Sequence, residues 1–118
     1  MGIETAALCL ALAACHESRG EPTSGQTAVM YVLLNRAQNT KNVCSELYKP
    51  KQFSFIGNVQ LASTIQLQPY ISMAYNVLHK KVKDPTKGAT YFHSKDVKPV
   101  WANDTVIVTG KQIGRAHV

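Results

Sequence analysis

The first third of the chain is dominated by apolar residues whose spacing indicates helices. Residues 3–16 are rich in alanine and leucine, which favour a helix, and they are apolar on nearly every side. A helix that is apolar all round is buried, so we expect this segment to form the centre of the core. Gly20 and Pro22 are predicted to end it, because glycine favours a helix end and proline cannot continue the hydrogen-bond ladder.

Two later stretches also have helical spacing. The second predicted helix is capped by Thr23 or Ser24, and its buried stripe consists of Ala28, Val29, Val32, Leu33 and Ala37. The third is predicted to open at Pro69, and its core face consists of Ile71, Ala74, Tyr75 and Leu78. Residues 84–88 then have the composition of a turn.

In the last third of the chain, the residue pattern changes from one typical of helices to one typical of strands. Residues 89–93 and 105–109 are rich in β-branched and aromatic residues, which favour strands. We expect these two short strands to pair on either side of a loop that carries Trp101. The predicted fold class is therefore α+β, with a helical majority and a small late sheet. At 118 residues, the chain is predicted to be one domain, 1–118.

Charge narrows the choice of partner. The formal net charge is +6 and the pI is about 9.4, which favours nucleic acid, an anionic membrane or an anionic cell wall. No signature of a nucleic-acid-binding module is present. No stretch approaches the roughly 18 apolar residues of a membrane span.

The three cysteines are predicted to be buried, reduced thiols. Their number is odd and they form no CxxC pair, which argues against a disulfide scaffold or a zinc site. Cys9 and Cys15 lie six residues apart on one predicted helix, so they point to different faces and should not form a disulfide.

The N-terminal apolar run resembles the core of a signal peptide. Residues 1–5, however, contain no lysine or arginine and do contain Glu4, so the positively charged segment that precedes such a core is missing. We therefore expect no signal peptide and a cytoplasmic protein.

Glu17 and Glu21 are the first candidates for chemistry. Glu17 directly follows the apolar helix, and a carboxyl group in an apolar pocket has a raised pKa. This is how a glycosidase keeps a general acid protonated near neutral pH. Glu21 is expected to be exposed. A two-carboxylate glycosidase would need a second acidic group, and Glu21, Asp96 and Asp104 are the candidates.

Aromatic residues suggest a surface for sugar rings. Phe53 lies in the middle loop, and Tyr91, Phe92, His93 and Trp101 cluster in the predicted β region. Core packing is the alternative explanation for these aromatic residues. The four histidines have no metal-ligand spacing, so we expect neither a metal nor another cofactor.

Taken in order, several segments resemble the SleB-type cell wall hydrolases, which include spore cortex-lytic enzymes and related bacterial and phage lysins. The matching segments are Glu17-Ser18-Arg19-Gly20-Glu21-Pro22, Gly25-Gln26, Ala28-Val29, Leu34-Asn35-Arg36, Gln52-Phe53-Ser54-Phe55, Asp84-Pro85-Thr86, Gly88-Ala89-Thr90-Tyr91-Phe92-His93, Trp101, Ile113-Gly114 and His117. They extend over almost the whole chain.

This resemblance implies a lysozyme-like fold, close to goose-type lysozymes and lytic transglycosylases. It implies cleavage of peptidoglycan between N-acetylmuramic acid and N-acetylglucosamine. By motif, Glu17 is the catalytic acid and base, and the products carry a 1,6-anhydro ring. Cleft residues are expected at Glu21, Gln52, Phe53, Ser54, Tyr91, Phe92, His93 and Trp101.

Three other functions remain open at this stage. The first is a hydrolytic muramidase that uses a second carboxylate, and the second is a non-catalytic wall-binding or structural phage protein. The third is a small basic nucleic-acid-binding protein. Under the favoured hypothesis, the protein is a monomer without a separate wall-binding domain or membrane anchor. It would remain cytoplasmic until phage lysis releases it to the wall.

Overall fold

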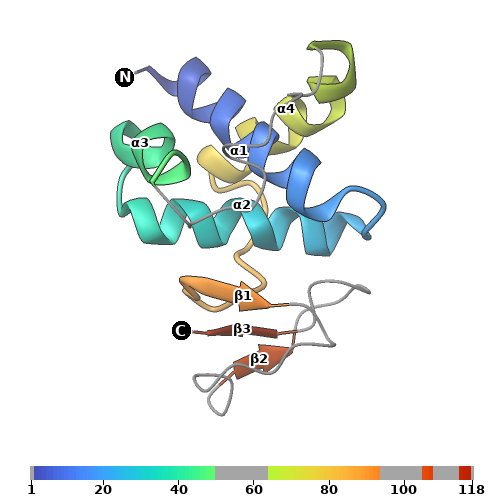
Figure 1. The fold of residues 1–118 in the computed structure, drawn as a ribbon, viewed down its shortest axis with the longest axis vertical. Coiled ribbons are helices and arrows are strands. Elements are labelled where there is room, and N and C mark those ends of the chain that lie inside the picture. The colour runs from blue at the N-terminus through green and yellow to red at the C-terminus, as the bar shows by residue number, and fades with distance from the viewer. Residues whose placement is uncertain (1, 50–63, 94–104, 108–114, 118) are drawn as a thin grey trace.

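The computed structural model describes residues 2–49, 64–93, 105–107 and 115–117. For the three short strands, only the backbone is described. The elements, in chain order, are α1 (Ile3–Ser18), α2 (Thr23–Ala37), the 3₁₀ turn η1 (Thr40–Asn42), α3 (Val43–Leu47), α4 (Thr64–Leu78), β1 (Tyr91–His93), β2 (Thr105–Ile107) and β3 (Arg115–His117). The helices gather in one layer, and the strands lie together beside it (Figure 1).

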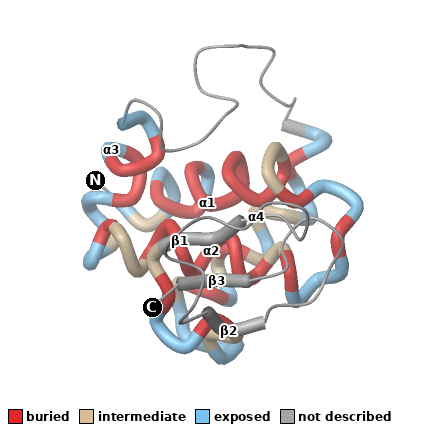
Figure 2. Tube along the Cα trace, turned by 60° about the horizontal axis from the view of Figure 1, so that its bottom comes forward, coloured by how far each residue is buried: buried red, intermediate tan, exposed pale blue. Residues whose placement is uncertain are grey.

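Helix α1 is the centre of the helical layer. It packs against α2, α3 and α4, and nearly all of its residues from Ala6 to Cys15 are buried (Figure 2). Alanine lets neighbouring helices approach closely, and Leu10 fills the remaining space as a fully buried side chain. The prediction of a buried central helix is therefore confirmed. The helix continues two residues beyond its predicted end, through Ser18.

Helix α4 begins earlier than the sequence pattern predicts. Its first residue is Thr64, so Pro69 lies inside the helix rather than in its first turn. Proline has no N–H to donate to the carbonyl of Ile65, four residues earlier. Ile65 is 84% exposed, so water can satisfy that carbonyl and the helix tolerates the proline.

The prediction of three reduced cysteines is wrong. Cys9 of α1 and Cys44 of α3 form a disulfide, with their Cα atoms 5.4 Å apart. Only Cys15 is a free, buried thiol. Cys9 and Cys15 share one helix and point to different faces, but Cys9 can pair with Cys44 because α3 packs directly against α1.

The three strands form an antiparallel sheet in the order β1-β3-β2. β3 lies between the other two, with Ala116 opposite both Phe92 and Val106. The expected direct pairing of residues 89–93 with 105–109 is therefore wrong, because strand β3 separates them. Strand β1 is next to α2, which places the sheet against this helix (Figure 1).

Candidate active site

Glu17 lies in the last turn of α1, just before the chain turns toward α2. It is half-buried. Of its neighbours in the sequence, Cys15 and Ser18 are buried and Arg19 is exposed. The hydroxyl of Ser18 donates a 2.6 Å hydrogen bond to the carbonyl of Ala14, which secures this last turn. Glu17 is thus attached to the core helix and remains partly open to solvent.

The connection after Glu17 is held by short-range hydrogen bonds. Gly20 has a φ of +85°, which glycine adopts without the strain of a side chain. The N–H of Glu21 then donates to the carbonyl of Ser18 at 3.0 Å, and the side chain of Gln26 donates to the carbonyl of Glu21 at 3.1 Å. Several residues of the Glu17–Gln26 motif therefore build a fixed turn between the two helices.

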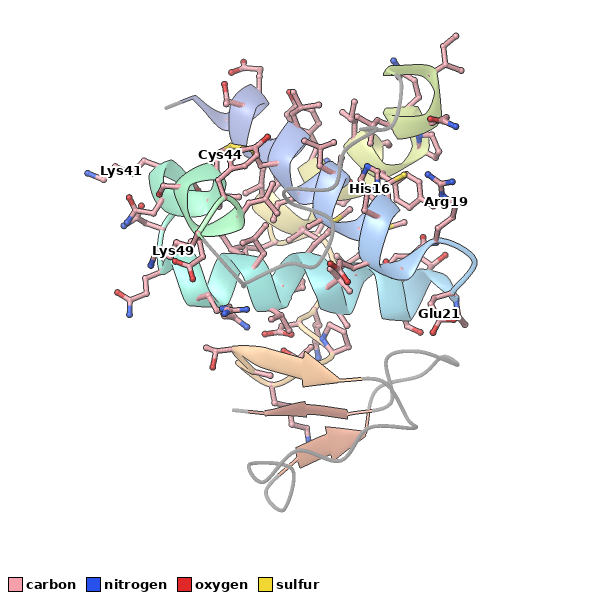
Figure 3. All side chains as sticks on the ribbon, in the orientation of Figure 1. His16, Arg19, Glu21, Lys41, Cys44 and Lys49 are labelled. Carbon is pink, nitrogen blue, oxygen red and sulfur yellow. A yellow bond between two sulfur atoms is a disulfide. The ribbon has the colours of Figure 1, made fainter. Side chains whose placement is uncertain are left out.

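Glu21 is buried, with 7% of its surface exposed, so the expectation that it is exposed is wrong. It lies at the connection between α1 and α2, at the same end of the helical layer as His16 and Arg19 (Figure 3). The hydrogen bonds around Gly20 fold the chain back, and this places Glu21 against the helices. Of the two carboxylates, Glu17 is therefore the more accessible to a large substrate.

The surroundings of Glu17 combine a neutral imidazole with a cation. Burial, together with the positive charge of Arg19, lowers the pKa of His16 below its ordinary value of 6.5. The Nη2 atom of Arg19 lies 3.3 Å from the sulfur of Cys15. Burial raises the pKa of Tyr70 on α4; Cys15 adds to this effect, and Arg19 opposes it. At neutral pH, His16 is therefore mostly uncharged, and Arg19 is the cation of this group.

A second polar cluster joins the end of α2 to the turn that leads into β1. Asn35 Nδ2 donates to Asp84 Oδ2 at 2.9 Å and to the carbonyl of Ala89 at 3.0 Å. The other oxygen of Asp84 accepts from the N–H and hydroxyl of Thr86 at 2.8 and 2.6 Å. Asp84 Oδ2 also accepts from the N–H of Gly88 at 3.0 Å. This cluster fixes the start of β1 relative to α2.

These contacts explain the state of Asp84. Burial alone would raise its pKa, but the hydrogen bonds from Thr86, Asn35 and Gly88 outweigh that effect and hold the pKa below its ordinary 3.8. Neither Asn35 nor Asp84 was among the site residues predicted from the sequence. Both stand in the segments that carry the family resemblance, and this was the available signal.

Several predicted cleft residues cannot be compared with the structure. Gln52, Phe53, Ser54 and Trp101 lie outside the described residues, as do Asp96 and Asp104. The backbone of Tyr91, Phe92 and His93 forms β1, and nothing is described of their side chains.

Within residues 2–49, 64–93, 105–107 and 115–117, no three histidine, cysteine, aspartate or glutamate side chains form a potential metal site. Likewise, none of the described helices has the length and apolar character needed to cross a membrane.

Residues 20–117 match the family described as Cell Wall Hydrolase. Glu17 lies three residues before the matched range. The chain is also 32% identical over 111 residues to a spore cortex-lytic enzyme of Halalkalibacterium halodurans, and 33% identical over 104 residues to one of Bacillus cereus. The aligned parts cover 88% and 82% of this chain, but only 32% and 39% of the relatives. The chain thus spans about a third of the length of these relatives.

Two solved structures have a similar fold. One is the catalytic domain of the Bacillus cereus SleB protein, with a TM-score of 0.67 and 26% identity, covering 93% of this chain and 88% of that one. The other is the catalytic domain of the germination-specific lytic transglycosylase SleB from Bacillus anthracis. Its TM-score is 0.68 with 27% identity, and 93% of each chain is covered.

Proposed function

The chain belongs to the cell wall hydrolase family, and from this premise we propose that it degrades peptidoglycan. We propose that it cleaves the glycosidic bond between N-acetylmuramic acid and N-acetylglucosamine. The fold would be of the lysozyme type, with the helical layer on one side of the cleft and the small sheet on the other.

In this proposal, Glu17 is the catalytic residue. Its carboxyl group donates a proton to the glycosidic oxygen while the bond from that oxygen to C1 of the muramic sugar breaks. The resulting carboxylate then accepts the proton of the muramic C6 hydroxyl, whose oxygen forms a new bond to C1. The product carries a 1,6-anhydro ring, and no water is consumed. One carboxyl group serves as acid and then as base.

The position of Glu17 supports this role. It is half-buried in the last turn of the core helix, and a hydrogen-bonded turn follows it. The similar fold of the Bacillus anthracis SleB catalytic domain, a lytic transglycosylase, supports the same chemistry. The buried position of Glu21 favours a role in holding this turn. We assign sugar contacts to Gln52, Phe53, Ser54, Tyr91, Phe92, His93 and Trp101.

Mass spectrometry of digested peptidoglycan tests the proposal. Wild-type protein should release muropeptides that are lighter than hydrolysis products by one water molecule. Glu17→Gln should reduce the rate by about 10⁴-fold or more, at the top of the range for general acid–base catalysis. The matched control is Glu4→Gln, because Glu4 is an exposed carboxylate in the first turn of the same helix.

The other outcomes each point to a different conclusion. Muropeptides with ordinary reducing ends would replace the transglycosylase by a hydrolytic muramidase, and the search for a second carboxylate would begin with Glu21. Full activity of Glu17→Gln would show that another group is the acid. Binding of peptidoglycan without any release by wild-type protein would favour a non-catalytic wall-binding protein.

We also propose that the protein is held in the cytoplasm and reaches the wall during phage lysis. Disulfides persist in oxidising surroundings, so Cys9 and Cys44 would join only after this release. Trapping free thiols before and after lysis tests this order. A measured requirement for a secretion pathway would contradict it.

A further inference from the structure

A pocket of about 570 Å³ lies away from Glu17, at the opposite end of α2. This volume is within the range of small-molecule sites, about 300–1,000 Å³. Its lining comes from the end of α2, the following turn, the end of α4 and the turn before β1. The lining residues are Leu34, Asn35, Gln38, Asn39, Thr40, Leu78, Lys80 and Gly88.

The path of the chain separates this pocket from the candidate catalytic residue. Glu17 precedes the connection to the start of α2, whereas the pocket is formed where α2 ends. A helix of 15 residues is about 22 Å long, so the two sites lie roughly one helix length apart. Strand β1, which starts three residues after Gly88, lies next to the same helix.

The walls of the pocket are held in place by hydrogen bonds. The N–H of Gln38 donates to the carbonyl of Leu34 at 2.9 Å, and the N–H of Lys80 donates to the carbonyl of Val77 at 3.1 Å. Gly88 is held by Asp84, and its φ of +87° is one that other residues adopt only with strain. A site with fixed walls loses little freedom when a ligand binds.

The chemistry of the lining suits an N-acetylated sugar. Leu34 and Leu78 offer apolar surface for a methyl group or a sugar-ring face. The amides of Gln38 and Asn39, and the hydroxyl of Thr40, can both donate and accept hydrogen bonds. An acetamido group and ring hydroxyls need this combination of apolar contact and neutral hydrogen bonding.

Charge decides how much anionic character the ligand can have. Two helices end at this pocket, and each C-terminus carries a partial negative charge of about half a unit, which disfavours a polyanion. Among the described lining residues there is no carboxylate and one cation, Lys80, whose Nζ lies 5.4 Å from the centre of the Tyr31 ring. The carboxylate of Asp84 lies behind the lining, where it accepts hydrogen bonds from Asn35 and Gly88. A mostly neutral ligand with a single carboxylate beside Lys80 therefore fits best.

From this lining, we propose that the pocket is a remote sugar-binding site for an N-acetylated amino sugar that bears a carboxylate. In peptidoglycan, a muramic acid unit whose lactyl carboxyl group carries no peptide stem has this chemistry. The inference rests on the proposed function. It adds that the glycan strand is held several sugars away from the bond at Glu17, so that long strands bind more tightly than short ones.

Amide NMR with a small ligand tests the site directly. The probe is the disaccharide in which N-acetylglucosamine precedes N-acetylmuramic acid, since it contains no bond that the enzyme would cut. We expect chemical-shift changes at Gln38, Asn39, Thr40 and Gly88. Asn39→Ala should weaken this binding about threefold to tenfold, the effect of one or two neutral hydrogen bonds. Its matched control is Asn76→Ala, since Asn76 is exposed on α4 outside the pocket.

A second pair of variants tests the carboxylate. Lys80→Gln should weaken binding of the disaccharide but not of chitobiose, which has acetamido groups and no carboxylate. Lys83→Gln, an exposed lysine of the same segment outside the lining, should change neither affinity. If Lys80→Gln binds each of the two sugars with the same affinity as wild type, the carboxylate requirement is overturned.

The possible failures can be told apart. If the amide chemical shifts of residues 38–40 and 88 do not change when the disaccharide is added, the remote site is overturned, even if wild-type protein releases muropeptides. Shift changes at these residues in a protein without turnover would support the remote site and contradict the proposed catalytic activity. A response to an acidic peptide alone, with none to either sugar, would replace the sugar by a peptide ligand and overturn the inference.

Discussion

Loss of the Cys9–Cys44 disulfide should cost much of the protein's stability. The double variant Cys9→Ala/Cys44→Ala removes the bridge without leaving new thiols. The bridge closes a loop between residues 35 positions apart, and the chain-entropy relation for a loop of that length corresponds to about 4 kcal/mol. Because a domain of this size is stable by about 5–15 kcal/mol, this is a large share of the free energy of unfolding.

The local consequence should appear in α3. This helix has only five residues, too few to be stable alone, and Val43 and Leu47 are the side chains that bury it beside the bridge. In the double variant, amide hydrogen exchange should therefore accelerate most in α3, while the centre of α1 stays protected until global unfolding.

Urea and thermal unfolding measure the global effect. The midpoint temperature should fall by about 15 °C in the double variant, given the entropy of unfolding of a chain of this length. The midpoint temperature of reduced wild-type protein should fall by a similar amount. Cys15→Ala is the control, because Cys15 is the free buried thiol and its loss should leave the sensitivity to reductant unchanged. If the double variant unfolds within about 1 kcal/mol of oxidised wild type, the loop-closure reasoning is refuted.

Three further predictions concern the polar groups. Because the pKa of Asp84 is lowered in the folded protein, its contribution to stability is present above pH 3.8 and is lost as pH falls through the lower, folded-state pKa. In urea unfolding, the stability difference between wild type and Asp84→Asn should therefore shrink over that pH range. A constant difference would show that the hydrogen bonds to Asp84 are irrelevant. Asn35→Ala should destabilise the protein by about 1–3 kcal/mol, because Asp84 loses one of its hydrogen-bond donors and the Ala89 carbonyl loses the hydrogen bond from Asn35. The exposed Asn76→Ala should change little, and equal unfolding midpoints for the two variants would refute this reasoning. The lowered pKa of His16 means that stability decreases as pH falls below 6.5, and His16→Gln should remove this part of the pH dependence of unfolding.

Much of the helical layer could be predicted because its signals are local. The alanine-rich run of α1, the buried stripe of α2 and the glycine at the turn before Glu21 each follow from residues close in sequence. The start of α4 was missed because Pro69 is normally a first-turn residue. The helix extends past it here because the carbonyl that loses its partner belongs to an exposed residue, Ile65, and exposure is a property of the folded chain.

The candidate site likewise has features that could be predicted from the sequence and features that could not. Glu17 could be singled out because an apolar helix leads directly to it, and α1 does carry it at its end. The burial of Glu21 could not be predicted, because it depends on how the turn at Gly20 folds back on the helices. The hydrogen bond between Asn35 and Asp84 joins residues 49 positions apart, and the remote pocket combines the ends of two helices. Neither could be predicted, because both depend on contacts between distant segments.

The amino-acid sequence alone thus determined much of the helical layer, the positive charge, the family resemblance and the choice of Glu17 as the proposed catalytic carboxyl group. These properties depend on the composition and spacing of neighbouring residues. The Cys9–Cys44 disulfide, the central place of β3 in the sheet, the burial of Glu21 and the pocket beside Lys80 depended on packing between distant segments. Local periodicity carries no information about which helix faces meet, so these features emerged only once the helices were assembled in space.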